Sequence, residues 1–238
     1  MKSTLALFSA LLCLPLAGCN SHQPGVADST PFSKPSEAPK LLPVKVAGKY
    51  GYMNTSGQLV INPQFDAAEA FSEGRAVICI GKPCDWFGKP GDSRWGYIDE
   101  TGKMVVTPQY QSASGFKEGL ASICTGDGCS GNDTAAGQSR GYIDRDGKVI
   151  IQPQFGIATD FHEGLAQVCI GKCDWTEGSG YNGKFGFIDH TGHFIINPIY
   201  DNAGDFENGL ASITVGKGDD AKRGYIDKTG KVVWQPSN

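Results

Sequence analysis

The chain has 238 residues and a formal net charge of -4, with 33 glycines, 13 prolines and 10% aromatic residues. This charge excludes a strongly basic nucleic-acid binder that works by neutralising phosphates. The aromatic content argues against a disordered chain, which cannot bury so many rings, and the glycine and proline content indicates many turns.

Residues 1–18 are predicted to be a signal peptide. Lys2 supplies the positive charge, and residues 4–14 form an apolar run that is shorter than a membrane-spanning helix of ~20 residues. The run Leu16-Ala17-Gly18-Cys19 closely resembles the lipobox of bacterial lipoproteins. The resemblance implies cleavage before Cys19 and a lipid on Cys19, which would anchor the protein to a membrane. An ordinary secreted protein is the alternative.

The lipoprotein resemblance also implies an address in the bacterial cell envelope. In that family an aspartate after the cysteine marks inner-membrane retention, and this chain has Asn20 there. The expected location is therefore the outer membrane, on its periplasmic face or at the surface. Residues 19–42 are predicted to be a tether, because prolines and small polar residues, which cannot build a core, dominate this stretch.

Residues 43–238 are predicted to form one repeat domain. A glycine followed by an apolar run recurs at Gly51, Gly96, Gly141 and Gly186, each 45 residues apart, and again at Gly224. Another glycine stands six residues after each, and a proline twelve residues after each. A fixed period in this range is typical of a solenoid, a propeller or an array.

Each repeat is predicted to hold three strands. The first is the Gly-Tyr-Ile-Asp run, an Asp-x-x-Gly turn follows, and a run rich in β-branched residues such as 103–107 is the second. The proline after this run is expected to end its pairing. A segment such as 65–71, expected to be a short helical turn or a loop, leads to the third strand, for example 120–123. The predicted fold is all-β, with about five three-stranded units in an open solenoid-like array or, alternatively, a five-bladed propeller.

The repeat resembles the WG repeat family. The family pattern is an aromatic residue before Gly, then Tyr-Ile-Asp, x-x-Gly-Lys, hydrophobic residues, Pro, an aromatic residue and Gly-Leu-Ala. It is followed over about residues 44–236, with Arg140 and Arg223 in place of the first aromatic residue in two copies. The literal Trp-Gly pair occurs once, at Trp95-Gly96. The resemblance implies an all-β module with binding or scaffolding roles. It implies no catalytic residues and no cofactor.

Six cysteines of the repeat domain are predicted to form three disulfides. They stand in pairs at matching repeat positions: Cys79 and Cys84, Cys124 and Cys129, Cys169 and Cys173. The fourth copy has Thr214 and Gly218 at these positions, and two partners lost together are expected to be bonded together. Zinc binding is the alternative, since the spacing is admissible, but no histidine accompanies a pair and an exported chain meets an oxidising compartment.

No catalytic or metal site is predicted. His190 and His193 stand in a turn where sister repeats have other polar residues, which indicates an exposed hairpin tip. The repeated aspartates, such as Asp99, invite a calcium interpretation, but the nonapeptide pattern of calcium repeats is missing and turn capping explains them better.

The long loops after the cysteines hold the candidate binding residues Trp86, Phe87, Trp175 and Tyr181. Insertions of a repeat array often form its binding face, and exposed aromatic rings suit partner surfaces. Alternatively, these rings only pack over the disulfides. The predicted function is a lipid-anchored, non-enzymatic module of the cell envelope that binds another protein or acts as a scaffold. An envelope glycan-binding or glycan-active protein is the alternative, and a structural spacer is a third possibility.

Overall fold

The computed structural model describes residues 40–84, 93–126, 129, 139–171, 173–177 and 180–237. These residues form five antiparallel sheets and one separate two-stranded hairpin, which confirms the all-β repeat fold. Within these ranges no helix has the length and hydropathy that a membrane span requires. The expected signal peptide and nearly all of the expected tether lie outside the described residues.

The first sheet has three strands, and each later sheet adds a short strand at one edge. The first sheet comprises β1 (Leu42–Val46), β2 (Lys49–Met53) and β3 (Leu59–Phe65). The second comprises β4 (Ala67–Ala68), β5 (Arg75–Ile80), β6 (Arg94–Asp99) and β7 (Met104–Tyr110). The third comprises β8 (Ser112–Ala113), β9 (Leu120–Cys124), β10 (Arg140–Asp144) and β11 (Val149–Phe155).

The last two sheets follow the same order, with one insertion. The fourth sheet comprises β12 (Ile157–Ala158), β13 (Ala166–Ile170), β16 (Lys184–Ile188) and β17 (Phe194–Tyr200). Between β13 and β16 the chain forms a hairpin of β14 (Trp175–Thr176) and β15 (Gly180–Tyr181). The fifth sheet comprises β18 (Asn202–Ala203), β19 (Leu210–Val215), β20 (Lys222–Asp227) and β21 (Val232–Ser237), with the 3-10 turn η3 (Gly218–Asp220) before β20.

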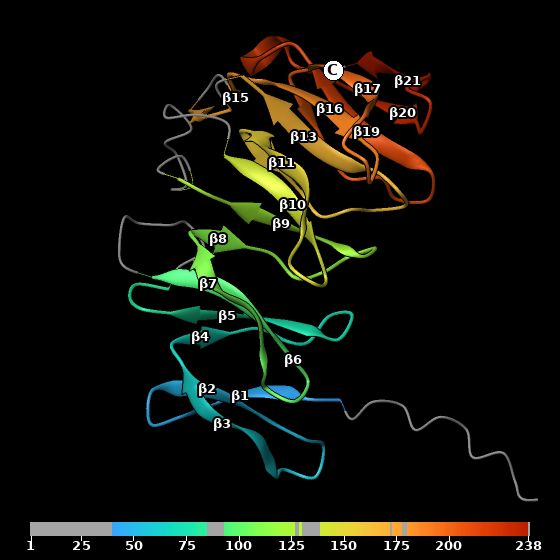
Figure 1. The fold of residues 1–238 in the computed structure, drawn as a ribbon. Helices are drawn as coiled ribbons and strands as arrows, with labels where there is room; N and C mark the ends of the chain where they lie inside the picture. Colours follow the sequence, from blue (N-terminus) through green and yellow to red (C-terminus); the bar gives the residue numbers. More distant parts are fainter. Residues whose placement is uncertain are drawn as a thin grey trace, which may run out of the picture. The chain divides into compact units, whose positions relative to one another are not determined.

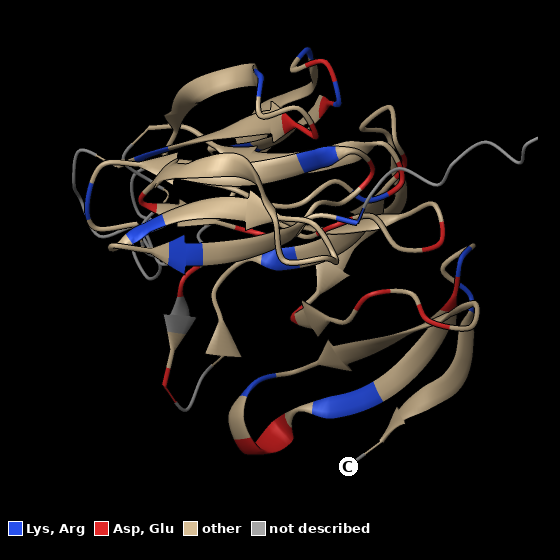
Figure 2. Ribbon diagram, turned by 90° about the horizontal axis from the view of Figure 1, so that it is seen from below, with Lys and Arg blue, Asp and Glu red and all other residues tan. Residues whose placement is uncertain are grey.

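The five sheets follow one another in chain order, from β1–β3 to β18–β21 (Figure 1). A buried apolar cluster joins each sheet to the next, and charged residues lie mainly in turns and near strand ends (Figure 2). No core cluster formed by the described residues joins the first sheet to the last. The structure is therefore the open array, and not the closed five-bladed propeller.

The joint between neighbouring sheets is a pair of aromatic rings. Tyr52 of β2 is fully buried, its ring lies 4.8 Å from that of Phe71, and its hydroxyl donates to the main-chain carbonyl of Glu69 at 2.7 Å. The same contact recurs at the next three joints, in the pairs Tyr97–Phe116, Tyr142–Phe161 and Phe187–Phe206. Each joint buries an aromatic pair that neither sheet could cover alone.

A two-residue turn adds a second link between units. Glu73 and Gly74 both have positive φ, 51° and 77°, which is the geometry of a type I′ turn. The Glu73 carboxylate accepts a hydrogen bond from the Gly119 N–H of the next unit at 2.9 Å. The same bond is made by Glu118 to Gly164 and by Glu163 to Gly209.

The proline of each repeat lies inside the second strand, so the expectation that it ends the pairing is wrong. In the first sheet the register passes from Tyr52↔Ile61 to Tyr50↔Phe65, which leaves a bulge around Pro63. The bulge accommodates the proline, which has no N–H to donate to the neighbouring strand, so strand pairing resumes beyond it. Gly51 faces this bulge, since a Cβ added to it would lie 2.7 Å from the Pro63 nitrogen. This close approach explains the twelve-residue spacing of glycine and proline.

The segment 65–71 is not a helical turn, and only residues 69–71 of it match the alternative expectation of a loop. Ala67 and Ala68 form β4, which pairs with Cys79 and Ile78 of β5. The segment runs alongside the third strand because its main-chain N–H groups find carbonyl partners there, as Glu69 does at Val77. Each of the last four sheets therefore has four strands where three were predicted.

Replacing Gly96 by alanine is expected to lower the free energy of unfolding by about 3 kcal/mol or more, since the added methyl group overpacks against the backbone of the bulge. Its Cβ would lie 2.7 Å from the Pro108 nitrogen and against the Val106 carbonyl. Urea unfolding monitored by fluorescence measures the loss. Gly57→Ala is the control: Gly57 has φ +81° with no neighbouring atom within 4 Å, so only about 1–2 kcal/mol is expected there. Equal losses for the two variants would contradict the close-approach role.

Candidate functional site

Three disulfides close the turns that follow the third strand of the inner sheets. Cys79, Cys124 and Cys169 are fully buried at or near the ends of β5, β9 and β13. The bonds are Cys79–Cys84, Cys124–Cys129 and Cys169–Cys173, which is the pairing that the sequence predicts. Each bond links residues only four or five positions apart, so it closes a local turn and leaves the sheets unlinked to one another.

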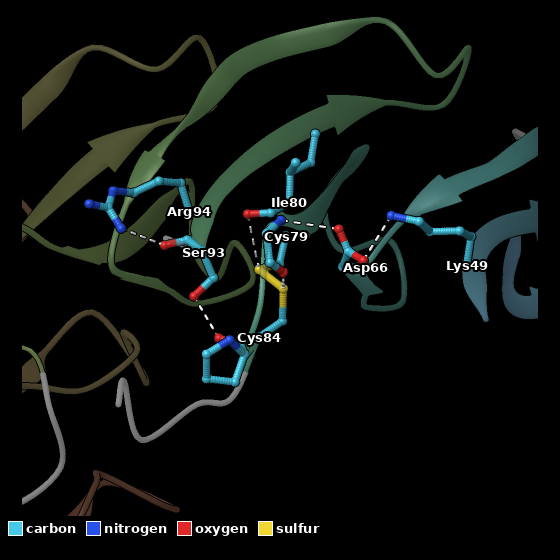
Figure 3. Close-up of a disulfide and its surroundings, with 9 residues drawn as sticks. Lys49, Asp66, Cys79, Ile80, Cys84, Ser93 and Arg94 are labelled. Atoms are coloured by element: carbon cyan, nitrogen blue, oxygen red, sulfur yellow. Dashed lines mark hydrogen bonds and ion pairs between the residues drawn. A yellow bond between two sulfur atoms is a disulfide. The ribbon is translucent and has the colours of Figure 1, made fainter. Parts of the chain in front are cut away.

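The first disulfide turn is held by polar contacts on both sides (Figure 3). Asp66 accepts from Lys49 Nζ at 2.8 Å and from the Gly81 N–H at 3.1 Å, and the Lys49 hydrogen bond holds the pKa of Asp66 below its usual value. On the other side Ser93 Oγ donates to the Pro83 carbonyl at 2.6 Å. The turn is thus anchored to the sheet before the chain enters its long connection.

Strand pairing places each buried cysteine in a row that crosses its sheet. We call this the cysteine row, meaning the residues paired side by side at the level of the first cysteine. The three rows are Ala67–Cys79–Trp95–Tyr110, Ser112–Cys124–Arg140–Phe155 and Ile157–Cys169–Phe185–Tyr200. Each contains a disulfide sulfur and at least one large aromatic ring that belongs to an apolar cluster, although the second row also holds the polar residues Ser112 and Arg140.

The same row in the last sheet is polar throughout. It reads Asn202–Thr214–Arg223–Ser237, with no sulfur and no ring. A cavity of about 270 Å³ opens beside it, lined by Asn202, Thr214 and Arg223 together with Tyr181 and Lys217. A second hollow, of about 240 Å³, shares the first three of these residues and extends to Tyr225. The structure therefore has a hollow where its sister sheets have a disulfide.

The cavity wall keeps the aspartate anchor of the disulfide turns. Asp201 accepts from Lys184 Nζ at 2.7 Å and from the Gly216 N–H at 2.9 Å, as Asp66 does in the first turn. Burial raises the pKa of Asp201, but the Lys184 hydrogen bond and the Gly216 N–H outweigh this and hold it below its usual value. The carboxylate is thus ionised and already satisfied.

The predicted binding residues are only partly described. Tyr181 lines the cavity, and its ring packs edge-on against Phe185 at 5.1 Å between centroids. The backbone of Trp175 pairs with that of Tyr181 in the β14–β15 hairpin, so the structure brings these two candidates together. Cys19, Trp86 and Phe87, and the side chain of Trp175, lie outside the described part of the chain.

Sequence reasoning missed Arg223, Lys217 and Asn202. The signal was present in the loss of both cysteines from the fourth copy, at Thr214 and Gly218. That loss was used only to pair the remaining cysteines. The strand pairing of the structure places Arg223 beside Thr214, which identifies the polar residues that replace the lost cysteine pair.

The repeated aspartates cap their turns. Asp99 Oδ1 accepts from the N–H groups of Thr101 and Lys103 at 2.9 and 3.0 Å, and Asp189 and Asp227 make the same contacts. The side-chain hydrogen bond from Thr101 is the main cause that holds the pKa of Asp99 below its usual value. Within the described ranges no three histidine, cysteine or acidic residues are grouped so as to hold a metal ion.

His190 differs from the exposed tip that the sequence predicts. Its ring stacks on Phe161 at 4.2 Å and its Nε2 lies 3.3 Å from the Glu118 carboxylate, so it takes part in the contact between units. His193 stays within its own turn, where its Nδ1 lies 2.8 Å from Thr191 Oγ1.

Four segments of the chain match the family model of the WG containing repeat, at residues 50–82, 95–129, 141–172 and 185–217. The chain belongs to the WG repeat family. Each matched WG repeat is offset from the sheets: the segment 50–82 covers β2 and β3 of one sheet and β4 and β5 of the next. A single WG repeat therefore contributes half of two neighbouring sheets, and the aromatic joint lies in its middle.

Other comparisons add little to the WG repeat assignment. No curated protein matches the sequence. Among solved structures, a crystal structure of a puromycin hydrolase mutant complexed with PGG is similar, with 11% sequence identity and a TM-score of 0.43. The match covers 80% of this chain and 33% of that one, so this chain spans about a third of its length.

Removing one disulfide with the double variant Cys124→Ala and Cys129→Ala is expected to lower the free energy of unfolding by about 2 kcal/mol, because a short closed loop restricts the unfolded chain. Chemical denaturation measures the loss. Thr214→Ala, at the matching position of the sheet that has no disulfide, is the control and is expected to change stability by less than about 0.5 kcal/mol. Mass spectrometry of unreduced peptides that showed links between repeats would contradict the pairing.

Glu69 gives a pH-dependent prediction. Burial, with a contribution from the charge of Asp160, raises the pKa of Glu69 to about 7 from an ordinary value of 4.5. The folded state then binds a proton that the unfolded state has released, so stability falls as the pH rises from about 4.5 to about 7. Glu69→Gln is expected to reduce this fall, as measured by urea unfolding at about pH 5 and about pH 8. The exposed Glu207→Gln is the control, and an unchanged slope in Glu69→Gln would refute the assignment.

Proposed function

We propose that the protein is a non-enzymatic binding module of the bacterial cell envelope. A lipid on Cys19 holds it to the outer membrane, and its last sheet binds another envelope protein. The observation that carries the proposal is the uncovered aromatic pair of this sheet. Tyr225 and Trp234 face each other across β20 and β21 and are 47% and 64% exposed. Their counterparts Tyr52 and Ile61 are buried under the next sheet.

An aromatic pair in this position is suited to contact with a partner. Tryptophan and tyrosine are enriched at the energetic centres of protein interfaces, and a large exposed apolar patch marks such sites. The stapled turns support the extracytoplasmic part of the proposal, since disulfides persist in oxidising compartments.

A photo-cross-linking residue placed at Trp234 in living cells is expected to capture one defined envelope protein. The same probe at Leu59, an exposed apolar residue of β3, is the control and is expected to capture none. Trp234→Ser should remove the partner in a pull-down without changing thermal unfolding, because the side chain is mostly exposed. Equal capture at both probe positions would count against the last sheet as the binding face.

The lipid anchor has its own test. Cys19→Ala is expected to abolish labelling by radioactive fatty acid and to release the protein from the membrane fraction or block its processing, because the acylated sulfur is lost. Fractionation of cell lysates and autoradiography measure both effects. A Cys19→Ala protein that still takes label and still sediments with membranes would refute the anchor.

Glycan binding is the second candidate function. The observation that favours it is the polar cavity between the β14–β15 hairpin and the turn after β19, whose lining includes both Tyr181 and Arg223. An aromatic ring beside a few convergent polar groups is the usual composition of a small-ligand site.

A further inference from the structure

The cavity of the last sheet has an excess of unsatisfied positive charge. The Arg223 guanidinium makes no hydrogen bond or ion pair with any residue that the structure describes, and Lys217 Nζ makes only a 3.3 Å contact with Asn182 Oδ1. Asp201, the acidic residue of the wall, is already paired with Lys184 at 2.7 Å. An anionic group that entered the cavity would therefore meet two available cations and a carboxylate that is already neutralised.

Uncharged polar groups surround these cations. Asn202 uses its side-chain oxygen to accept from the Ala203 N–H at 2.9 Å, which leaves its amide NH₂ to donate. Thr214 adds a hydroxyl, which can donate or accept, and it lies directly beside Arg223 in the strand pairing. The cavity thus offers donors and acceptors at the same level as the guanidinium, as a ligand with several hydroxyl groups requires.

The size and the aromatic wall restrict the ligand further. A volume of about 270 Å³ admits one small ring compound, since drug-sized ligands occupy pockets of about 300 Å³ and more. The ring of Tyr181 supplies an apolar surface at one side, fixed by its edge-on packing against Phe185. The neighbouring hollow of about 240 Å³ shares Arg223 and leads to Tyr225, so a longer chain has room to continue.

We propose that this cavity binds a carboxylate-bearing sugar unit of an acidic glycan, with the carboxylate on Arg223 and Lys217 and the sugar ring against Tyr181. The fork of an arginine matches the two oxygens of a carboxylate in a bidentate contact. The inference deepens glycan binding, the second candidate function, and rests on it. Its test is separate from that of the protein partner proposed for Tyr225 and Trp234, although the second hollow reaches Tyr225.

Calorimetric titration of the full-length protein in detergent with glucuronate, glucose and acetate tests the inference. Glucuronate is expected to bind measurably. Glucose and acetate are expected to bind at least about tenfold more weakly, because glucose lacks the carboxylate and acetate lacks the sugar ring. Arg223→Gln is expected to weaken glucuronate binding at least about tenfold. Lys222→Gln, the adjacent residue of β20, is the matched control, because neighbouring strand residues point to opposite faces.

The possible outcomes separate the inference from the function on which it rests. If acetate binds as well as glucuronate, the cavity is a simple anion site and the inference is overturned. If glucose binds as well as glucuronate and Arg223→Gln has no effect, the result supports glycan binding but overturns the proposed recognition of a carboxylate-bearing sugar. If no sugar binds, both are overturned, and cross-linking at Trp234 remains as a separate question. Amide NMR shifts that move at Gly216 and Thr214 with glucuronate would place the ligand in this cavity.

Discussion

The whole array depends on the aromatic joint between one sheet and the next. The first-strand tyrosine is buried in the apolar cluster between its own sheet and the next, where the phenylalanine of the following unit packs against its ring. The hydroxyl also requires a partner once it is buried, and in the first three joints a main-chain carbonyl of the following unit accepts from it at 2.7–2.8 Å. A unit without its neighbour would expose a large ring and leave a polar group unsatisfied, so the units stabilise one another in series.

The sequence was sufficient to find the repeat, the order of the three main strands and the disulfide pairs, because all three leave marks at fixed spacing. It was not sufficient for Pro63, since the rule that proline interrupts a ladder does not say whether pairing resumes beyond a bulge. The short strand Ala67–Ala68 was missed because two residues are too few for alternation to show. The polar cavity depends on side-by-side neighbours such as Thr214 and Arg223, which a single sequence does not reveal before the register is known.

One position in the fold thus serves two purposes. In the inner sheets the cysteine of the row staples a turn, and the aromatic rings of the row are packed in the apolar clusters between sheets. Among the described residues no further sheet packs on the row of the last sheet, so the packing requirement is absent there. Thr214 and Ser237 can then stand where the inner sheets have a sulfur and an aromatic ring, and Arg223 stands where they have Trp95, Arg140 or Phe185.

The offset between sequence repeat and sheet has a consequence for how such chains change length. A segment such as 50–82 begins in one sheet and ends in the next, so duplicating it would insert two half-sheets that complete each other. Both terminal sheets would keep their own strands, and with them the polar cavity and the exposed aromatic pair. Gene duplication could therefore lengthen the array without rebuilding either terminal sheet, whereas a deletion of half a segment would leave strands with no sheet to join.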